Sequence, residues 1–123
     1  MIVFRGGRAD RLRLNLRRAP LYLRVAFSRV TGEWDALDQL GDTPGPKERV
    51  YVYRRVGEAS RFHVKYAGRS RHLSGWHADA VYEPVAEPPD DATARGTESW
   101  RAWCVERQQW EKAHEPRAEA NPG

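Results

Sequence analysis

The sequence predicts a mainly β (α+β) protein: a small antiparallel half-barrel or sheet of five to six strands, with one short helical turn and a C-terminal amphipathic helix. Three observations support this fold class. Apolar and polar residues alternate along most of the chain up to residue 85, which is the period of half-buried strands. Clusters of Gly and Pro interrupt the alternation, as turns between strands do. Apolar residues recur at helical spacing only near the C-terminus.

The chain is predicted to form one domain, because 123 residues can build one hydrophobic core but not two. We expect residues 1–86 to form the antiparallel β domain and residues 87–96 to form an acidic, Pro-rich linker. Residues 97–113 are predicted to form the amphipathic helix, packed over one opening of the half-barrel. Residues 114–123 are predicted to be a disordered tail, because they show no apolar pattern.

The first part of the chain contains two alternating stretches. Leucines alternate with arginines around residues 11–17, and a second alternation runs from Leu21 to Phe27. Pro20 lies between them and cannot donate a ladder hydrogen bond, so the first stretch would be an edge strand. Residues 1–19 could instead form a flexible basic arm, with the stable domain beginning near Leu21.

The centre of the β domain is predicted to hold a helical turn, a hairpin and a last strand. Apolar residues three apart at Trp34, Leu37 and Leu40, followed by Gly41, predict a short helical lid over residues 34–41. Residues 49–67 alternate on both sides of Gly57, which predicts a hairpin that turns at this glycine. A basic, Gly- and Ser-containing loop over residues 68–75 is then expected to lead into a last strand over residues 76–85.

Positive charge is concentrated in the N-terminal part of the chain. The formal net charge is +4, but residues 1–31 hold eight arginines against one acid, whereas residues 84–123 hold more acids than bases. A basic region predicts a polyanionic partner, because neutralised phosphates release counterions. Arg outnumbers Lys by 18 to 3, however, and the codon bias of a GC-rich genome can produce the same skew. The arginine content alone therefore does not decide the partner.

No pattern in the sequence predicts catalysis, a metal or a cofactor. The histidines are scattered, and none has the paired spacing of a structural zinc site. The sequence has no Gly-rich phosphate loop and no nucleophile elbow. Asp35 and Asp38 are interpreted as carboxylates that are solvated or that accept from the exposed amides of a first helical turn. We therefore expect a protein that is not an enzyme and that holds no cofactor.

Basic and aromatic side chains interleave in the centre of the chain, as they do on small β-barrels that bind single strands. Tyr51 and Tyr53 either stack bases or pack the second face of the sheet. The predicted nucleic-acid contacts are Arg61, His63, Lys65, Arg69, Arg71 and His72, with Arg11, Arg13 and Arg17 from the N-terminal part.

Three tryptophans share one stripe of the predicted C-terminal helix: Trp100, Trp103 and Trp110. Such a stripe usually docks on its own domain, with Cys104 as a small apolar neighbour. Alternatively, the tryptophans bind a protein partner, because Trp is a frequent interface anchor. A single cysteine predicts a cytoplasmic protein, and the apolar stretches are far shorter than the roughly 20 residues that span a bilayer, so no membrane contact is expected.

Together these patterns predict a non-catalytic accessory or adaptor protein that contacts nucleic acid or a nucleoprotein complex through an Arg-rich surface. The alternative is a protein–protein interaction module, either an assembly subunit or a small inhibitor, with no direct nucleic-acid contact.

Overall fold

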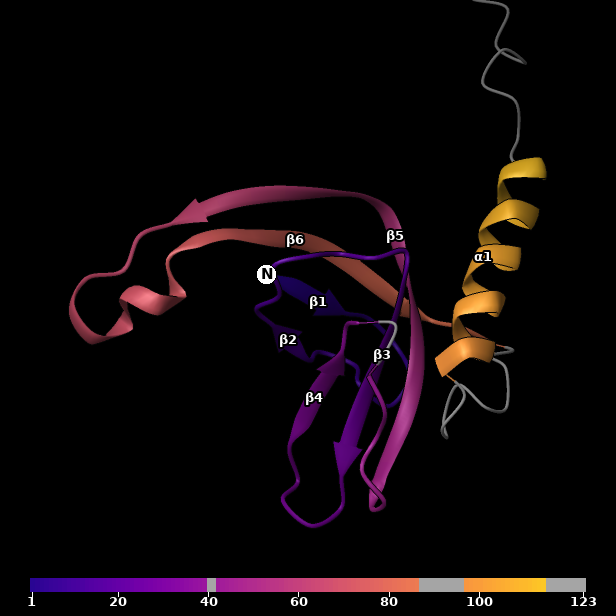
Figure 1. Cartoon of the computed structure of the whole chain (residues 1–123), viewed down its shortest axis with the longest axis horizontal. Helices are drawn as coiled ribbons and strands as arrows, with labels where there is room; N and C mark the ends of the chain where they lie inside the picture. Colours follow the sequence, from indigo (N-terminus) through magenta and orange to yellow (C-terminus); the bar gives the residue numbers. More distant parts are fainter. Residues whose placement is uncertain (40–41, 87–96, 115–123) are drawn as a thin grey trace, which may run out of the picture.

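The computed structural model describes residues 1–39, 42–86 and 97–114, and shows a curled six-stranded sheet with one helix outside it (Figure 1). The mainly β fold class, with a C-terminal helix, is confirmed. The predicted linker over 87–96 and residues 115–123 of the predicted tail lie outside the described residues. The elements are β1 (Ile2–Phe4), β2 (Arg13–Leu14), β3 (Tyr22–Ser28), β4 (Trp34–Leu37), β5 (Glu48–Val64), the 3-10 helix η1 (Gly68–Leu73), β6 (Gly75–Pro84) and α1 (Thr97–Ala113).

The strands lie in the order β2-β1-β6-β5-β3-β4, so the first strand of the chain sits between the second and the last. β1 runs parallel to β6, with Ile2 opposite Ala80 and Phe4 opposite Tyr82, whereas the other neighbouring pairs are antiparallel. The sheet is therefore mixed, and the prediction of a purely antiparallel sheet was wrong in this detail. Period-two alternation identifies a strand but does not predict whether the neighbouring strand runs parallel or antiparallel to it.

The predicted helical lid over 34–41 was wrong, because residues 34–37 form β4. Trp34 pairs with Phe27 and Ala36 with Val25, so residues two apart face the sheet interior. The ring centroids of Trp34 and Phe27 are 5.0 Å apart. Gly32, with φ +73°, turns the chain between β3 and β4. Cross-strand packing on β3 therefore outweighs the helical spacing that the same residues also satisfy.

The predicted hairpin over 49–67 was also wrong, because β5 runs without a turn from Glu48 to Val64. Gly57 does adopt a positive φ of +74°, but it lies in an irregularity of the β5–β6 ladder between Val56 and Ser60. Such a bulge bends a strand instead of reversing it. β5 and β6 continue beyond the bend as a two-stranded ribbon that leaves the body of the sheet and ends in η1 (Figure 1). We call residues 60–79 the arm.

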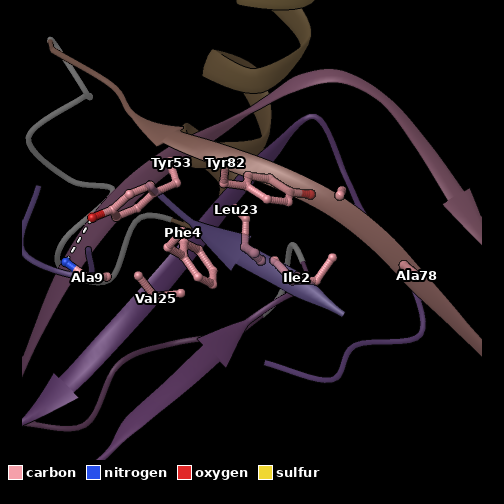
Figure 2. Packing of buried hydrophobic residues seen from close by; sticks show 9 residues of the cluster. Ile2, Phe4, Ala9, Leu23, Val25, Tyr53, Ala78 and Tyr82 are labelled. Carbon is pink, nitrogen blue, oxygen red and sulfur yellow. Dashed lines mark hydrogen bonds between the residues drawn. The ribbon is translucent and has the colours of Figure 1, made fainter. Parts of the chain in front are cut away.

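The inner face of the sheet holds the main core (Figure 2). Phe4 packs edge-on against Tyr53 and stacks on Tyr82, with ring centroids 5.0 and 5.7 Å away. Tyr53 is 1% exposed, so this tyrosine packs the sheet and is not available to stack a base. Its hydroxyl donates to the carbonyl of Gly6 at 2.7 Å and accepts from the amide of Ala9 at 2.9 Å. The core thereby fixes the loop between β1 and β2.

Helix α1 packs on the outer face of β3 and β5. The sequence pattern had instead placed this helix over one opening of the half-barrel. Trp100 and Cys104 lie against Tyr22 and Val52, which alternate with the inner-face residues of the same strands. At the other end of the helix, the Glu111 carboxylate accepts hydrogen bonds from the Tyr22 hydroxyl at 2.6 Å and from the Arg54 guanidinium at 2.9 Å. Burial opposes ionisation of Glu111, but these hydrogen bonds lower its pKa overall.

The three tryptophans of α1 contribute unequally to docking, which predicts unequal losses of stability. Trp100 is 2% exposed and Trp110 is 53% exposed. Trp100→Ala should therefore lower the free energy of unfolding by about 3–5 kcal/mol, as large aromatic deletions in cores do. The matched change Trp110→Ala should cost less than about 1 kcal/mol. Denaturant unfolding of both variants checks this, and equal losses would contradict the described docking of the helix.

Candidate nucleic-acid interface

The arm carries most of the residues that the sequence assigns to nucleic-acid binding. Arg61 lies opposite Ala78 and His63 lies opposite Trp76, so these four residues share one face of the ribbon. Ala78 belongs to the main core, and the alternation of β6 places Trp76 on the same side. The inner face of the sheet therefore continues onto the arm, where it becomes exposed.

Trp76 is the centre of this exposed face. Its side chain is 51% exposed. The Arg61 guanidinium carbon lies 5.4 Å from the centre of the Trp76 ring, within the range of a cation–π contact. The His63 ring also contacts the indole, in a T-shaped arrangement with the ring centroids 5.2 Å apart. Both neighbours limit the movement of the indole, and part of its surface stays open to solvent.

Two arginines from the segment between β2 and β3 complete the site. Arg17, Arg18, Arg61 and Trp76 line a cavity of about 620 Å³, with small residues as its remaining wall. We call it the arm cavity. It has three guanidinium groups and no carboxylate among its lining residues. The geometry suits an anion that carries a planar group, because guanidinium binds phosphate and an indole stacks on rings.

Arg17 also ties this segment to the arm. Its guanidinium donates to the carbonyls of His72 at 3.3 Å, Ser74 at 3.4 Å and Trp76 at 3.4 Å. The carbonyl of Leu16 accepts from the amide of Ala78 at 2.8 Å. Gly75 leaves room for Arg17, because a Cβ there would lie 2.8 Å from Nη1. Arg17 was predicted as a contact, but in the structure much of its hydrogen bonding is used to hold the arm.

The tip of the arm, residues 65–74, displays the other predicted contacts. Lys65, Arg69, Arg71 and His72 are all exposed around η1. The fold of the tip is fixed by Ser74, whose hydroxyl accepts from the amide of Tyr66 at 2.7 Å. The tip therefore presents cations on a short, hydrogen-bonded turn.

Two of the predicted N-terminal contacts lie elsewhere. Arg13 is in β2, where it pairs with Val3 and lies on the face opposite to the core residue Leu14. The Arg11 side chain is 94% exposed, with its nitrogen 3.9 Å from the Asp10 carboxylate. The structure does not gather them with the arm cavity. Arg24, which adds to the basic count, is buried beneath Trp100, and burial lowers its pKa.

The docking of α1 on the sheet covers part of the tryptophan stripe that the sequence offered as a binding surface for a protein partner. Trp100 is buried and Trp103 is half-buried, with its ring 4.8 Å from the Tyr22 ring. Trp110 stays exposed and stacks on His114 at 4.1 Å. Only Trp110 of the three therefore presents a large free surface.

Sequence reasoning missed Arg18 and Trp76. Trp76 could have been found from its strand pattern, since it alternates with core residues of β6. Its pairing with His63 depends on the β5–β6 register, and the approach of Arg18 depends on the path of the chain after β2. Neither of these is encoded in local spacing.

Three further features of the described residues bear on function: metal-binding side chains, the single thiol and the apolar length of the helices. It contains no group of three or more His, Cys, Asp or Glu side chains placed to hold a metal ion. Burial raises the pKa of Cys104 to about 11, so the thiol is protonated at neutral pH. None of the helices described is long and apolar enough to cross a membrane.

Comparison of the chain with protein-family models, curated proteins and solved structures gives no match.

The hydrogen bonds of Arg17 predict that it stabilises the arm locally. Arg17→Ala should lower the free energy of local opening of the arm by about 1 kcal/mol, because the hydrogen bonds of the guanidinium to the arm are lost. The amides of Tyr66 and Ser74 should then exchange hydrogen roughly fivefold faster. Arg18→Ala is the matched control, since no hydrogen bond of its side chain to the arm is found among the described residues. Exchange measured by NMR checks both variants. Unchanged exchange in Arg17→Ala would show that the arm holds its shape without this side chain.

Proposed function

We propose that this protein is a non-catalytic accessory or adaptor that contacts nucleic acid, free or within a nucleoprotein complex, through the inner face and tip of its arm. The observation that carries the proposal is the half-exposed Trp76 ring, flanked by Arg61 and His63 and bordered by Arg17 and Arg18. Stacking of one base on an aromatic ring contributes about 1–3 kcal/mol. Cations beside the ring hold the phosphates that flank that base.

The charge of the arm supports a polyanionic partner. Residues 60–79 contain four Lys or Arg and three His, against a single acid, Asp79. Asp79 lies on the face opposite to Arg61, and its carboxylate is 3.3 Å from the N-terminal ammonium of Met1. The inner face of the arm therefore carries cations without a nearby compensating carboxylate from its own strands. Such a surface steers phosphates toward Trp76.

A single strand fits this surface better than a duplex. Stacking on Trp76 needs a base whose face is free, and bases in a duplex are already stacked on one another. The arm cavity of about 620 Å³ is in the size range of small-ligand sites, so it can hold one nucleotide of a strand. The remaining nucleotides would follow the cations of the arm tip.

A second function, protein–protein interaction, is favoured by one specific observation. The arm exposes the apolar side chains of Phe62, Tyr66 and Leu73 in addition to Trp76. Exposed apolar groups gathered on one element are typical of surfaces that bind proteins. In that case the arm would act as an interaction module, and binding of its partner would depend only weakly on salt.

If the arm binds a single strand, the affinity should depend on salt, and the cations of the arm tip should contribute to this dependence. Affinity for a single strand should fall with salt by a log–log slope of about −0.7 for each phosphate contact. Replacement of Arg69 and Arg71 by Ala should reduce the slope by about 1–1.4, while Trp76→Ala should weaken binding and leave the slope unchanged. Fluorescence anisotropy of a labelled oligothymidylate at several salt concentrations measures both effects.

The control for this experiment is Arg11→Ala with Arg13→Ala, which removes the same charge from outside the arm. If the slope changes in the control and not in the Arg69 and Arg71 variant, the contact surface is the N-terminal one. No binding to DNA or RNA at low salt would overturn the proposed function in favour of the protein-interaction module.

A further inference from the structure

A second cluster of arginines and aromatic rings lies at the opposite end of β5 from the arm. The rings of Phe27, Trp34 and Tyr51 form a row, with centroids 5.0 and 5.8 Å apart. They line a cavity of about 390 Å³, together with Arg8, Arg29 and Arg49. We call it the Trp34 cavity. Phe27 pairs directly with Trp34 and with Arg49 in the sheet, so β3, β4 and β5 each contribute one side of the cavity.

The backbone around Arg8 is held in place by the core. Its neighbours are fixed by the Tyr53 hydroxyl, which binds the Gly6 carbonyl and the Ala9 amide, as Figure 2 shows for Ala9. Gly6 and Gly7 have φ values of +89° and +69°, and a Cβ at Gly7 would lie 2.8 Å from the Tyr53 hydroxyl oxygen. Ala9 is buried in the core. Arg8 therefore projects from a loop whose backbone is already fixed, so ligand binding beside it does not have to order that backbone.

The charges of the Trp34 cavity are not compensated by carboxylates. Among the described residues, neither Arg8, Arg29 nor Arg49 forms an ion pair, and no acid lines the cavity. Glu48 is the nearest acid along β5, but it alternates with Arg49 and its carboxylate accepts from the Gly45 amide at 2.5 Å. Three guanidinium groups around one cavity repel each other, and a bound anion would relieve this repulsion.

We propose that the Trp34 cavity binds a nucleotide, with the base against the row of aromatic rings and the phosphate between the arginine side chains. Guanidinium forks match the geometry of phosphate, and aromatic rings contact a base through its flat face. The volume of about 390 Å³ lies at the lower end of the range for ligand sites, which suits one nucleotide. The ligand is either a free nucleotide or the terminal nucleotide of a strand. This site uses no residue of the arm, so it stands independently of the proposed function.

The first test uses adenosine monophosphate as the probe. Isothermal titration calorimetry should show binding at low salt that falls by about tenfold or more in Arg29→Gln and in Arg49→Gln, because each removes a charge-assisted hydrogen bond. The indole signal of Trp34 should shift in the NMR spectrum during the titration. Arg101→Gln on α1 is the matched control, because Arg101 lines neither the Trp34 cavity nor the arm cavity, and this variant should bind as the unchanged protein does. All three positions are exposed, so folding should be preserved, which thermal unfolding checks.

The second test separates the two sources of the nucleotide. Oligothymidylates with a phosphate or a hydroxyl group at the 5′ end are titrated while the Trp34 indole signal is followed. A Trp34 shift with adenosine monophosphate assigns the cavity to free nucleotides, and a shift only with the phosphorylated strand assigns it to strand ends. The inference is overturned if Trp34 shifts with none of these probes, or if Arg29→Gln and Arg49→Gln leave every affinity unchanged. Loss of arm binding in Arg69 and Arg71 variants would leave this result untouched.

Discussion

The bend in β5 determines where almost every other part of the molecule lies. Before the bend, β5 lies between β3 and β6 and supplies Tyr53 to the inner core and Val52 to the surface beneath α1. After it, the same strand pairs only with β6 and carries Arg61 and His63 into solvent. Between the pairs Val56–Val81 and Ser60–Asp79, β5 has three residues and β6 has only Ala80. β5 therefore has two extra residues at the bulge, and because two is an even number, the same face of the strand continues beyond it. The face that is core in the body is therefore the face that is exposed on the arm.

The inner face consequently has a packed middle and two open ends. Tyr53 and its neighbours fill the middle, whereas Trp76 at one end and Trp34 at the other are only partly covered. Each end pairs aromatic rings with arginines, and neither cavity has a carboxylate in its lining. Both kinds of side chain suit a ligand that combines flat rings with phosphates. Tyr53 connects the core to one of these ends, because its hydroxyl fixes the loop that carries Arg8.

Local patterns predicted the strands better than the connections between them. Alternation correctly identified β3 and β6, and helical spacing identified α1. The Trp34 segment fits both helical and strand spacing, and its pairing with β3 decides between them. Gly57 has the positive φ of a turn, yet β6 follows β5 past it, so the glycine forms a bulge. Each error comes from pairing with another strand, which the pattern within the segment itself does not encode.

The same distinction applies to the candidate site. Alternation placed Arg61, His63 and Lys65 on one side of a strand, and the structure keeps Arg61 and His63 together on the exposed inner face. The role of Trp76 depends on register. The burial of Arg24 depends on a helix that packs over its strand, and a count of arginines cannot reveal it.

We propose that the inner face of the arm contacts an unpaired base. Photo-crosslinking with a single strand that contains iodouracil, followed by mass spectrometric mapping of the crosslinked peptide, can detect this contact. We expect a crosslink to Trp76 or His63 that is lost in Trp76→Ala or competed away by unlabelled strand. A crosslink confined to Trp110 on α1, or the absence of any specific crosslink at low salt, would contradict it.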